Sequence, residues 1–135
     1  MEMNHVLVVE DDKEIREGVE IYLKSQGYEV FQAADGIEGL EVIEKEEIHL
    51  AIVDIMMPRM NGWDTARTIR AMNRPDAEII PIIAMSANAF SEDIMDRRLV
   101  GMDIHLAKPL DEAKMINALK RCIAERSAVK LRNDL

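Results

Sequence analysis

Short apolar runs alternate along this chain with longer segments of mixed polarity. Four of the apolar runs are rich in Val and Ile and have the length of buried strands: residues 6–9, 50–53, 79–85 and 104–107. A shorter run, Tyr28–Phe31, follows Gly27. Runs that are apolar at every position, rather than at alternate positions, indicate a parallel sheet that is covered on both faces.

The intervening segments carry apolar residues at helical spacing. In Lys13–Gln26 an apolar stripe lies on one side, and Gly27 is a typical residue just past a helix end. Further helices are predicted to open at Asp35, near Trp63, at Ser91 and at Asp111. The order of elements is therefore βαβαβαβαβα, and right-handed crossovers would make it a doubly wound (βα)5 three-layer sandwich with a five-stranded parallel sheet.

The length of 135 residues and the hydrophobic content of 48% suit one domain, predicted at residues 1–125. Residues 126–135 are expected to form a frayed polar tail or linker stub. No apolar run approaches the roughly 20 residues of a membrane span, and the N-terminus does not resemble a secretory signal. The single Cys122 fits a reducing cytoplasm, and the net charge of -9 argues against a nucleic-acid surface.

Each of the four longer apolar runs ends on a reactive residue. In chain order these residues are the pair Glu10 and Asp11, then Asp54, Ser86 and Lys108. Ligands of open parallel sheets bind just beyond the carboxyl ends of the strands. Three carboxylates, one hydroxyl and one ammonium group are therefore expected to meet in one crevice, although they lie far apart in sequence.

Carboxylates gathered in one crevice repel each other, and a bound divalent cation relieves that repulsion. Mg²⁺ prefers oxygen ligands in octahedral geometry and keeps several waters, so one or two direct carboxylates suffice. We expect Asp11 and Asp54 as direct ligands and Glu10 as a direct or water-mediated one. The backbone carbonyl of Met56 could complete the protein's share, and Mn²⁺ is expected to substitute for Mg²⁺.

Asp54 could also act as a nucleophile. A carboxylate can attack a phosphoryl group and form an acyl phosphate, and a metal ion can neutralise the transferred oxygens. In this interpretation Lys108 pairs with one phosphoryl oxygen, and Ser86 donates a hydrogen bond to another.

These residues together resemble the receiver domain of two-component response regulators. They also resemble the receivers of hybrid histidine kinases. The resemblance runs from Val6 to about Ala124 and rests on four motifs: Val8-Val9-Glu10-Asp11-Asp12, Val53-Asp54-Ile55-Met56-Met57-Pro58 with Asn61-Gly62, Met85-Ser86-Ala87 and Lys108-Pro109. It implies the flavodoxin-like strand order 2-1-3-4-5. It also implies a phosphoacceptor Asp54, a magnesium site of Glu10, Asp11 and Asp54, and phosphate-sensing Ser86 and Lys108. The implied phosphoryl donor is a sensor histidine kinase or a histidine phosphotransfer protein.

One position departs from the pattern of that family. Its switch residue on the fifth strand is commonly Tyr or Phe, and here it is His105, whose ring we expect to move together with Ser86. The expected function is a cytoplasmic phosphorylation switch that changes the surface of the fourth helix, fifth strand and fifth helix. Such a domain is not an enzyme beyond weak self-phosphorylation and self-dephosphorylation.

Of three alternatives to this switch, the first remains open and the other two are disfavoured by the sequence. The chain could be a phosphorelay intermediate or phosphate sink of a hybrid kinase system. A metal-dependent phosphatase of the haloacid-dehalogenase type would need a carboxylate two residues after Asp54, where Met56 stands. A degenerate, metal-free interaction domain would not need the complete acidic set.

Overall fold

Five parallel strands form a single sheet in the order β2-β1-β3-β4-β5. The computed structural model describes residues 3–55, 60–77, 79–86, 101–108 and 110–134, with side chains in the last segment described as far as Arg126. The strands are β1 (His5–Val9), β2 (Glu29–Ala33), β3 (Leu50–Asp54), β4 (Ile82–Ser86) and β5 (Ile104–Ala107). The predicted fold class and strand order are confirmed.

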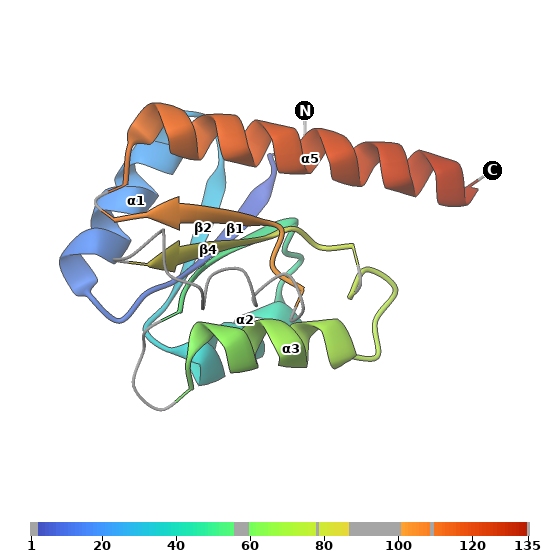
Figure 1. Cartoon of the computed structure of the whole chain (residues 1–135), viewed down its shortest axis with the longest axis horizontal. Coiled ribbons are helices and arrows are strands. Elements are labelled where there is room, and N and C mark those ends of the chain that lie inside the picture. Colours follow the sequence, from blue (N-terminus) through green and yellow to red (C-terminus); the bar gives the residue numbers. More distant parts are fainter. Residues whose placement is uncertain (1–2, 56–59, 78, 87–100, 109, 135) are drawn as a thin grey trace.

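Helices cover both faces of this sheet. They are α1 (Lys13–Ser25), α2 (Gly36–Lys45), α3 (Gly62–Ala71) and α5 (Glu112–Asp134). Figure 1 shows α1 and α5 on one side of the strands and α2 and α3 on the other. None of the helices in the described segments is long and apolar enough to cross a membrane. The helix predicted to open at Ser91 lies outside the described residues.

The sheet separates two hydrophobic cores, and successive strand residues alternate between them. Val6 and Val8 of β1 pack with α1 and α5. Leu7 and Val9 pack with α2 and α3. All five residues of β3 and of β4 are buried. Burial on both faces is the reason why these strands appear in the sequence as unbroken apolar runs.

Side-chain caps fix the helix starts that lie near the carboxyl ends of the strands. The Asp12 carboxylate accepts hydrogen bonds from the Glu14 and Ile15 amides at the start of α1. Asp35 and Asn61 cap α2 and α3 in the same way.

The predicted stop at Gly27 is also present. Gly27 has φ 91°, and the Gly27 and Tyr28 amides donate to the carbonyls of Lys24 and Leu23, which is the Schellman pattern of a helix end.

The start of the fourth strand was predicted too early. The apolar run begins at Ile79, but β4 begins at Ile82. The Ile79 and Ile80 amides donate to the Asp76 carbonyl at 3.1 and 2.9 Å, and Pro81 has no amide hydrogen. Turn hydrogen bonds therefore take up the donors that a longer strand would need.

The C-terminal segment is helical rather than frayed. α5 continues to Asp134, and Arg126 anchors it to the body of the domain. The Arg126 guanidinium lies 3.5 Å from Asp76 Oδ2 and donates to the His49 carbonyl at 3.3 Å. The domain boundary at residue 125 and the linker role of residues 126–135 stay predictions.

Candidate functional site

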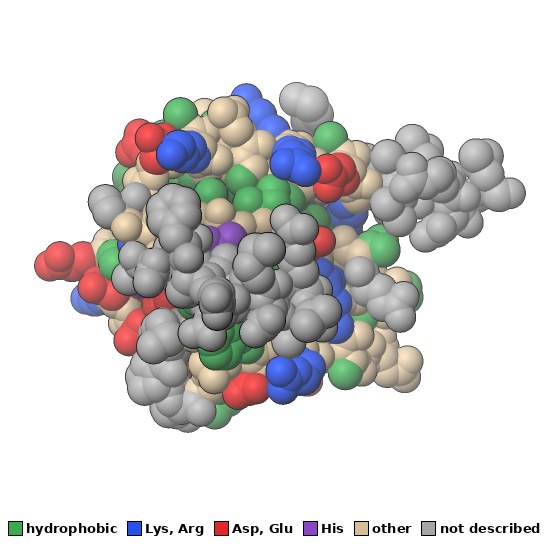
Figure 2. Space-filling view, in the orientation of Figure 1, with side chains coloured by type: hydrophobic (Ala, Val, Ile, Leu, Met, Phe, Trp, Pro, Cys, Tyr) green, Lys and Arg blue, Asp and Glu red, His purple; other side chains and the backbone are tan. Residues whose placement is uncertain are grey.

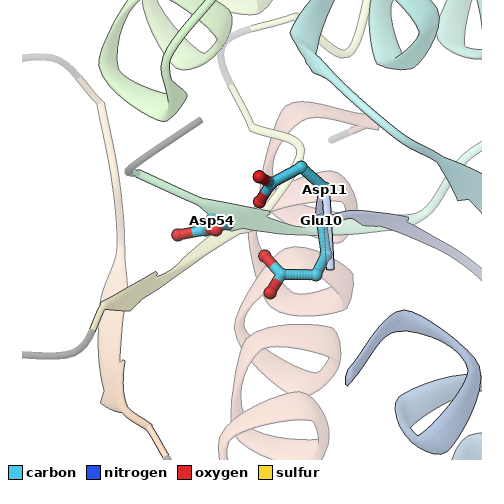
Figure 3. Close-up of side chains that lie close together, drawn as sticks. All are labelled: Glu10, Asp11 and Asp54. Carbon is cyan, nitrogen blue, oxygen red and sulfur yellow. The ribbon is translucent and has the colours of Figure 1, made fainter. Parts of the chain in front are cut away.

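Three carboxylates converge at the carboxyl end of the sheet. Glu10 and Asp11 directly follow β1, and Asp54 is the last residue of β3, which pairs with β1. Figure 3 shows the three side chains close together, and one oxygen from each lies within 4.8 Å of the others. Glu10 is 0% and Asp54 2% exposed, whereas Asp11 is exposed. The sequence predicted the convergence but not which of the acids is buried.

Lys108 supplies a cation to this pocket from the end of β5. Its Nζ donates to Glu10 Oε1 at 2.7 Å and to Asp54 Oδ2 at 3.1 Å. The Lys108 amide donates to the Ser86 carbonyl at 2.8 Å, which extends the pairing of β4 with β5 by one residue. The backbone thus places the predicted ammonium group beside the predicted carboxylates.

The balance of charge in the pocket shows in the pKa values of its groups. Burial raises the pKa of Glu10 to about 8, and the neighbouring Asp54 carboxyl group adds to the increase, while Lys108 opposes it. Burial also acts to lower the pKa of Lys108, but hydrogen bonds and charges from Glu10 and Asp54 raise it above its usual value. Without a further cation, Glu10 therefore holds a proton below about pH 8.

One carboxylate oxygen shows that this pocket fits a cation. Glu10 Oε2 is buried and has no hydrogen-bond partner within the described part of the chain. When Glu10 and Asp54 are both ionised, they have no hydrogen to share, so Asp54 cannot satisfy that oxygen, whereas a cation would. A set of oxygen donors suits Mg²⁺. Met56, whose carbonyl was predicted as a further ligand, lies outside the described residues.

Ser86 and His105 form the predicted pair of neighbours on β4 and β5. Ser86 Oγ and His105 Nε2 are 2.8 Å apart, which is a hydrogen-bond distance. Ser86 is buried and His105 half-buried. The contact links the end of β4 to β5, so a movement of either side chain would break or change the hydrogen bond to the other.

The start of α3 lies directly against the end of β3. A Cβ atom added at Gly62 would lie 2.6 Å from the Asp54 carbonyl oxygen and 2.7 Å from Ile55 Cα. Only glycine permits this approach without a backbone shift. Gly62 therefore shapes the backbone around Asp54, beyond the turn that the sequence predicted there.

Sequence reasoning missed Arg16, which contacts the backbone of the acidic pair Glu10 and Asp11. Its Nη1 donates to the backbone carbonyl of Glu10 at 2.7 Å. A polar residue in the first turns of a helix is normally exposed, and no short-range pattern marks a contact to a strand end. The weak signal was the position of Arg16 four residues after the helix cap Asp12.

A model of the response regulator receiver domain matches residues 6–120. The chain belongs to the response regulator receiver domain family. This receiver domain is 34% identical over 119 residues to the transcriptional regulatory protein CseB of Streptomyces avermitilis. The match covers 88% of this chain and 48% of CseB. It is 35% identical over 115 residues to the protein PilG of Pseudomonas aeruginosa, covering 85% of the chain and 84% of PilG. It thus spans about half the length of CseB but most of PilG.

Among solved structures, this receiver domain is similar to the receiver domain of the sensor histidine kinase PA1611 from Pseudomonas aeruginosa. The two are 32% identical with a TM-score of 0.82, and the match covers 91% of this chain and 99% of that one. That structure has a magnesium ion coordinated in its active-site cleft. The family resemblance inferred from the sequence motifs is confirmed.

Proposed function

We propose that this receiver domain is a signalling switch that accepts a phosphoryl group on Asp54 in a Mg²⁺-dependent reaction. The proposal rests on the Asp54 carboxylate, which is buried, lies 3.1 Å from the Lys108 ammonium group and has two further acids beside it. A surface aspartate would need none of these neighbours.

Each residue of the pocket has a part in the proposed reaction. An Asp54 oxygen forms a bond to phosphorus as the phosphorus–nitrogen bond of a phosphohistidine breaks and the imidazole leaves with the bonding electrons. Lys108 pairs with the arriving phosphoryl oxygens. Glu10, Asp11 and Asp54, with the Met56 carbonyl, would hold Mg²⁺ or Mn²⁺, which when bound neutralises charge on the transferred group.

The donor in this proposal is a sensor histidine kinase or a histidine phosphotransfer protein in the cytoplasm. The free, buried Cys122 is consistent with a reducing compartment. The domain itself would add only weak self-phosphorylation and self-dephosphorylation, since the chemistry needs a reactive donor.

Ser86 and His105 are proposed as the switch. Their hydrogen bond of 2.8 Å occupies the Ser86 hydroxyl in the structure described. Once Asp54 is phosphorylated, Ser86 would donate to a phosphoryl oxygen and its contact with His105 would change. The surface from Ser91 to Ala124 would then be displaced. The described part of this surface includes β5 and the first half of α5.

A phosphorelay intermediate or phosphate sink is the second candidate. It is favoured by the similarity to the receiver domain of the PA1611 sensor histidine kinase, because that receiver belongs to a kinase, as a receiver in a hybrid kinase system would. The phosphatase alternative is disfavoured by Met56, and the metal-free alternative by the intact acidic cluster.

Phosphoryl uptake from a small acyl phosphate tests the proposed reaction. Intact-mass spectrometry should show one added phosphoryl group in the wild type with Mg²⁺ or Mn²⁺, and none with a chelator. Asp54→Asn should abolish the addition, whereas Asp64→Asn, at an exposed aspartate of α3, should retain it. Equal labelling of the Asp54 variant would place the reaction elsewhere.

Amide hydrogen exchange separates a switch from a relay or sink. With a beryllofluoride mimic and Mg²⁺, protection in β5 and the first half of α5 should change together with the loops around Asp54. Changes confined to those loops would favour a relay or sink. His105→Phe, which keeps a ring but removes the hydrogen bond to Ser86, should alter the response of β5.

A further inference from the structure

Arg16 connects the backbone of the acidic pair to two other elements. It lies in the second turn of α1 and is half-buried. Its Nη1 donates to the Glu10 carbonyl at 2.7 Å, and its Nε donates to Gln32 Oε1 of β2 at 2.8 Å. Gln32 Nε2 in turn donates to Glu20 Oε2 of α1 at 2.7 Å. Three hydrogen bonds thus form one chain that ends on the peptide between Glu10 and Asp11.

This chain determines the direction in which the guanidinium group points. The planar guanidinium presents its donors in a fixed fork, so two acceptors on different elements hold it in one orientation. Glu20 accepts from the amide nitrogen of Gln32, which leaves the amide oxygen facing Arg16. A lysine could reach one acceptor but would lack this fork.

Glu10 is consequently held on both sides of its α-carbon. Its amide donates to the Ala33 carbonyl of β2 at 3.0 Å, and its carbonyl accepts from Arg16. Asp11 is exposed and lies between the strand end and the cap of α1. The peptide plane between Glu10 and Asp11 contains the Glu10 carbonyl and the Asp11 Cα. A hydrogen bond that fixes the carbonyl therefore also fixes the position from which the Asp11 side chain extends.

The contact also leaves the carboxylates available. Both hydrogen bonds from Arg16 described above end on neutral oxygens, a backbone carbonyl and an amide. Lys108, in contrast, donates directly to the Glu10 and Asp54 carboxylates. Arg16 therefore contributes orientation without taking an oxygen that a metal ion would use.

We propose that Arg16 is a positioning residue, which holds the Glu10–Asp11 peptide so that both carboxylates face Asp54 and a divalent cation. The inference rests on the proposed function, because the cation is needed for phosphoryl transfer. Partners that orient ligands in this way typically change metal affinity about 10- to 100-fold when they are removed.

Magnesium titration of the folded protein tests this role. Calorimetry with MgCl₂ should give a Kd about 10-fold higher for Arg16→Gln than for the wild type. Arg16→Lys should recover part of the loss. Gln32→Met, which keeps the Arg16 donor to Glu10 but removes its second acceptor, should show a smaller loss. Arg67→Gln, at an exposed arginine of α3, is the matched control and should leave the Kd unchanged.

A purely structural role would give a different pattern. Arg16→Gln and Gln32→Met would then lower the melting temperature without Mg²⁺ while the Mg²⁺ affinity of the folded protein stayed at the wild-type value, and the proposal would be overturned. Failure of the proposed function is a separate result: wild type and Arg67→Gln would bind Mg²⁺ but take up no phosphoryl group on Asp54. In that case a raised Kd in Arg16→Gln would still support the positioning role.

Discussion

Two groups of charged residues lie at opposite ends of the sheet and differ in how their charges are balanced. At the carboxyl end, two of the three clustered carboxylates, Glu10 and Asp54, share the Lys108 ammonium group, and Glu10 Oε2 has no partner among the described residues. At the amino ends of β4 and β5, the Arg70 guanidinium is surrounded by acceptors. It donates to the carbonyls of Ala77, Ile80 and Gly101 and to Asp103 Oδ2.

The contrast indicates which group is built for stability and which for binding. The donors of Arg70 are matched by fixed acceptors, and Asp103 Oδ2 also accepts from the Ile82 amide, so the group joins α3 to two strands. The acidic pocket has more acceptors than donors, which costs stability until a cation enters. Figure 2 shows acidic and basic side chains interspersed on the viewed face.

Breaking the Arg70 group should have the largest effect on stability. Arg70→Met leaves several carbonyls and the Asp103 carboxylate without their donor, so we expect the free energy of unfolding to fall by about 3 kcal/mol. Urea denaturation measures this change. Arg67→Met, on the exposed side of the same helix, should stay within about 0.5 kcal/mol of the wild type.

The same Arg70 variant also tests the separation of the two groups. The folded fraction of Arg70→Met should still take up one phosphoryl group, because the acidic pocket lies at the other end of the sheet. A loss of phosphoryl uptake in a variant that is still folded would show that the two ends are coupled.

Arg70 and Arg16 also show what the sequence could not reveal. The apolar runs and their terminal residues were enough to predict a parallel sheet and the meeting of Glu10, Asp54 and Lys108, because the carboxyl ends of parallel strands lie at the same edge of a sheet. Both arginines act through backbone carbonyls of residues that are distant in sequence or belong to another element, and such contacts leave no periodic pattern.

The errors at element boundaries have a similar cause. Ile79 and Ile80 are as apolar as the residues of β4, and only the turn hydrogen bonds to Asp76 separate them from that strand. Where α5 continues past the predicted domain boundary, Arg126 contacts Asp76 and the His49 carbonyl, which are close to it only in the folded chain.

Neutralising Glu10 should have an intermediate effect that depends on pH. The pKa of Glu10 is about 8 in the folded protein, against a usual value of 4.5, so the folded state binds the extra proton between these values. In the absence of Mg²⁺, the stability of the wild type should therefore be greatest at low pH in this window and should fall as the pH rises to about 8. Above pH 8 Glu10 is ionised in the folded protein as well, and the full cost of burying its charge then lowers the stability.

Glu10→Gln imitates the protonated side chain and should remove this pH dependence. Above pH 8 the metal-free variant should exceed the wild type in unfolding free energy by roughly 2 kcal/mol, and near pH 5 the two should be similar. Thermal melts in a chelator from pH 5 to 9 measure the difference, with Glu17→Gln on the exposed side of α1 as control. Parallel curves for wild type and Glu10→Gln would refute the burial of a strained carboxylate.

Asp11→Asn should have the smallest effect on stability but a clear effect on metal binding. Asp11 belongs to the same acidic cluster as Glu10, yet it is exposed, and water screens its repulsion from the other two carboxylates. The metal-free variant should therefore gain only about 0.5 kcal/mol of unfolding free energy. Its Mg²⁺ affinity should nevertheless fall, because one oxygen ligand of the cluster is replaced by a neutral amide.

Asp12→Asn is the matched control for this last prediction. It removes the same charge from the adjacent residue, and asparagine caps a helix about as well as aspartate, so α1 should be preserved. Thermal melts in a chelator and magnesium titrations on both variants give the two quantities. If Asp12→Asn weakened Mg²⁺ binding as much as Asp11→Asn, the effect would come from net charge near the pocket. If only Asp11→Asn weakened Mg²⁺ binding, Asp11 would be shown to act in binding although it contributes little to stability. The excess of acceptors over donors at this end of the sheet predicts that result.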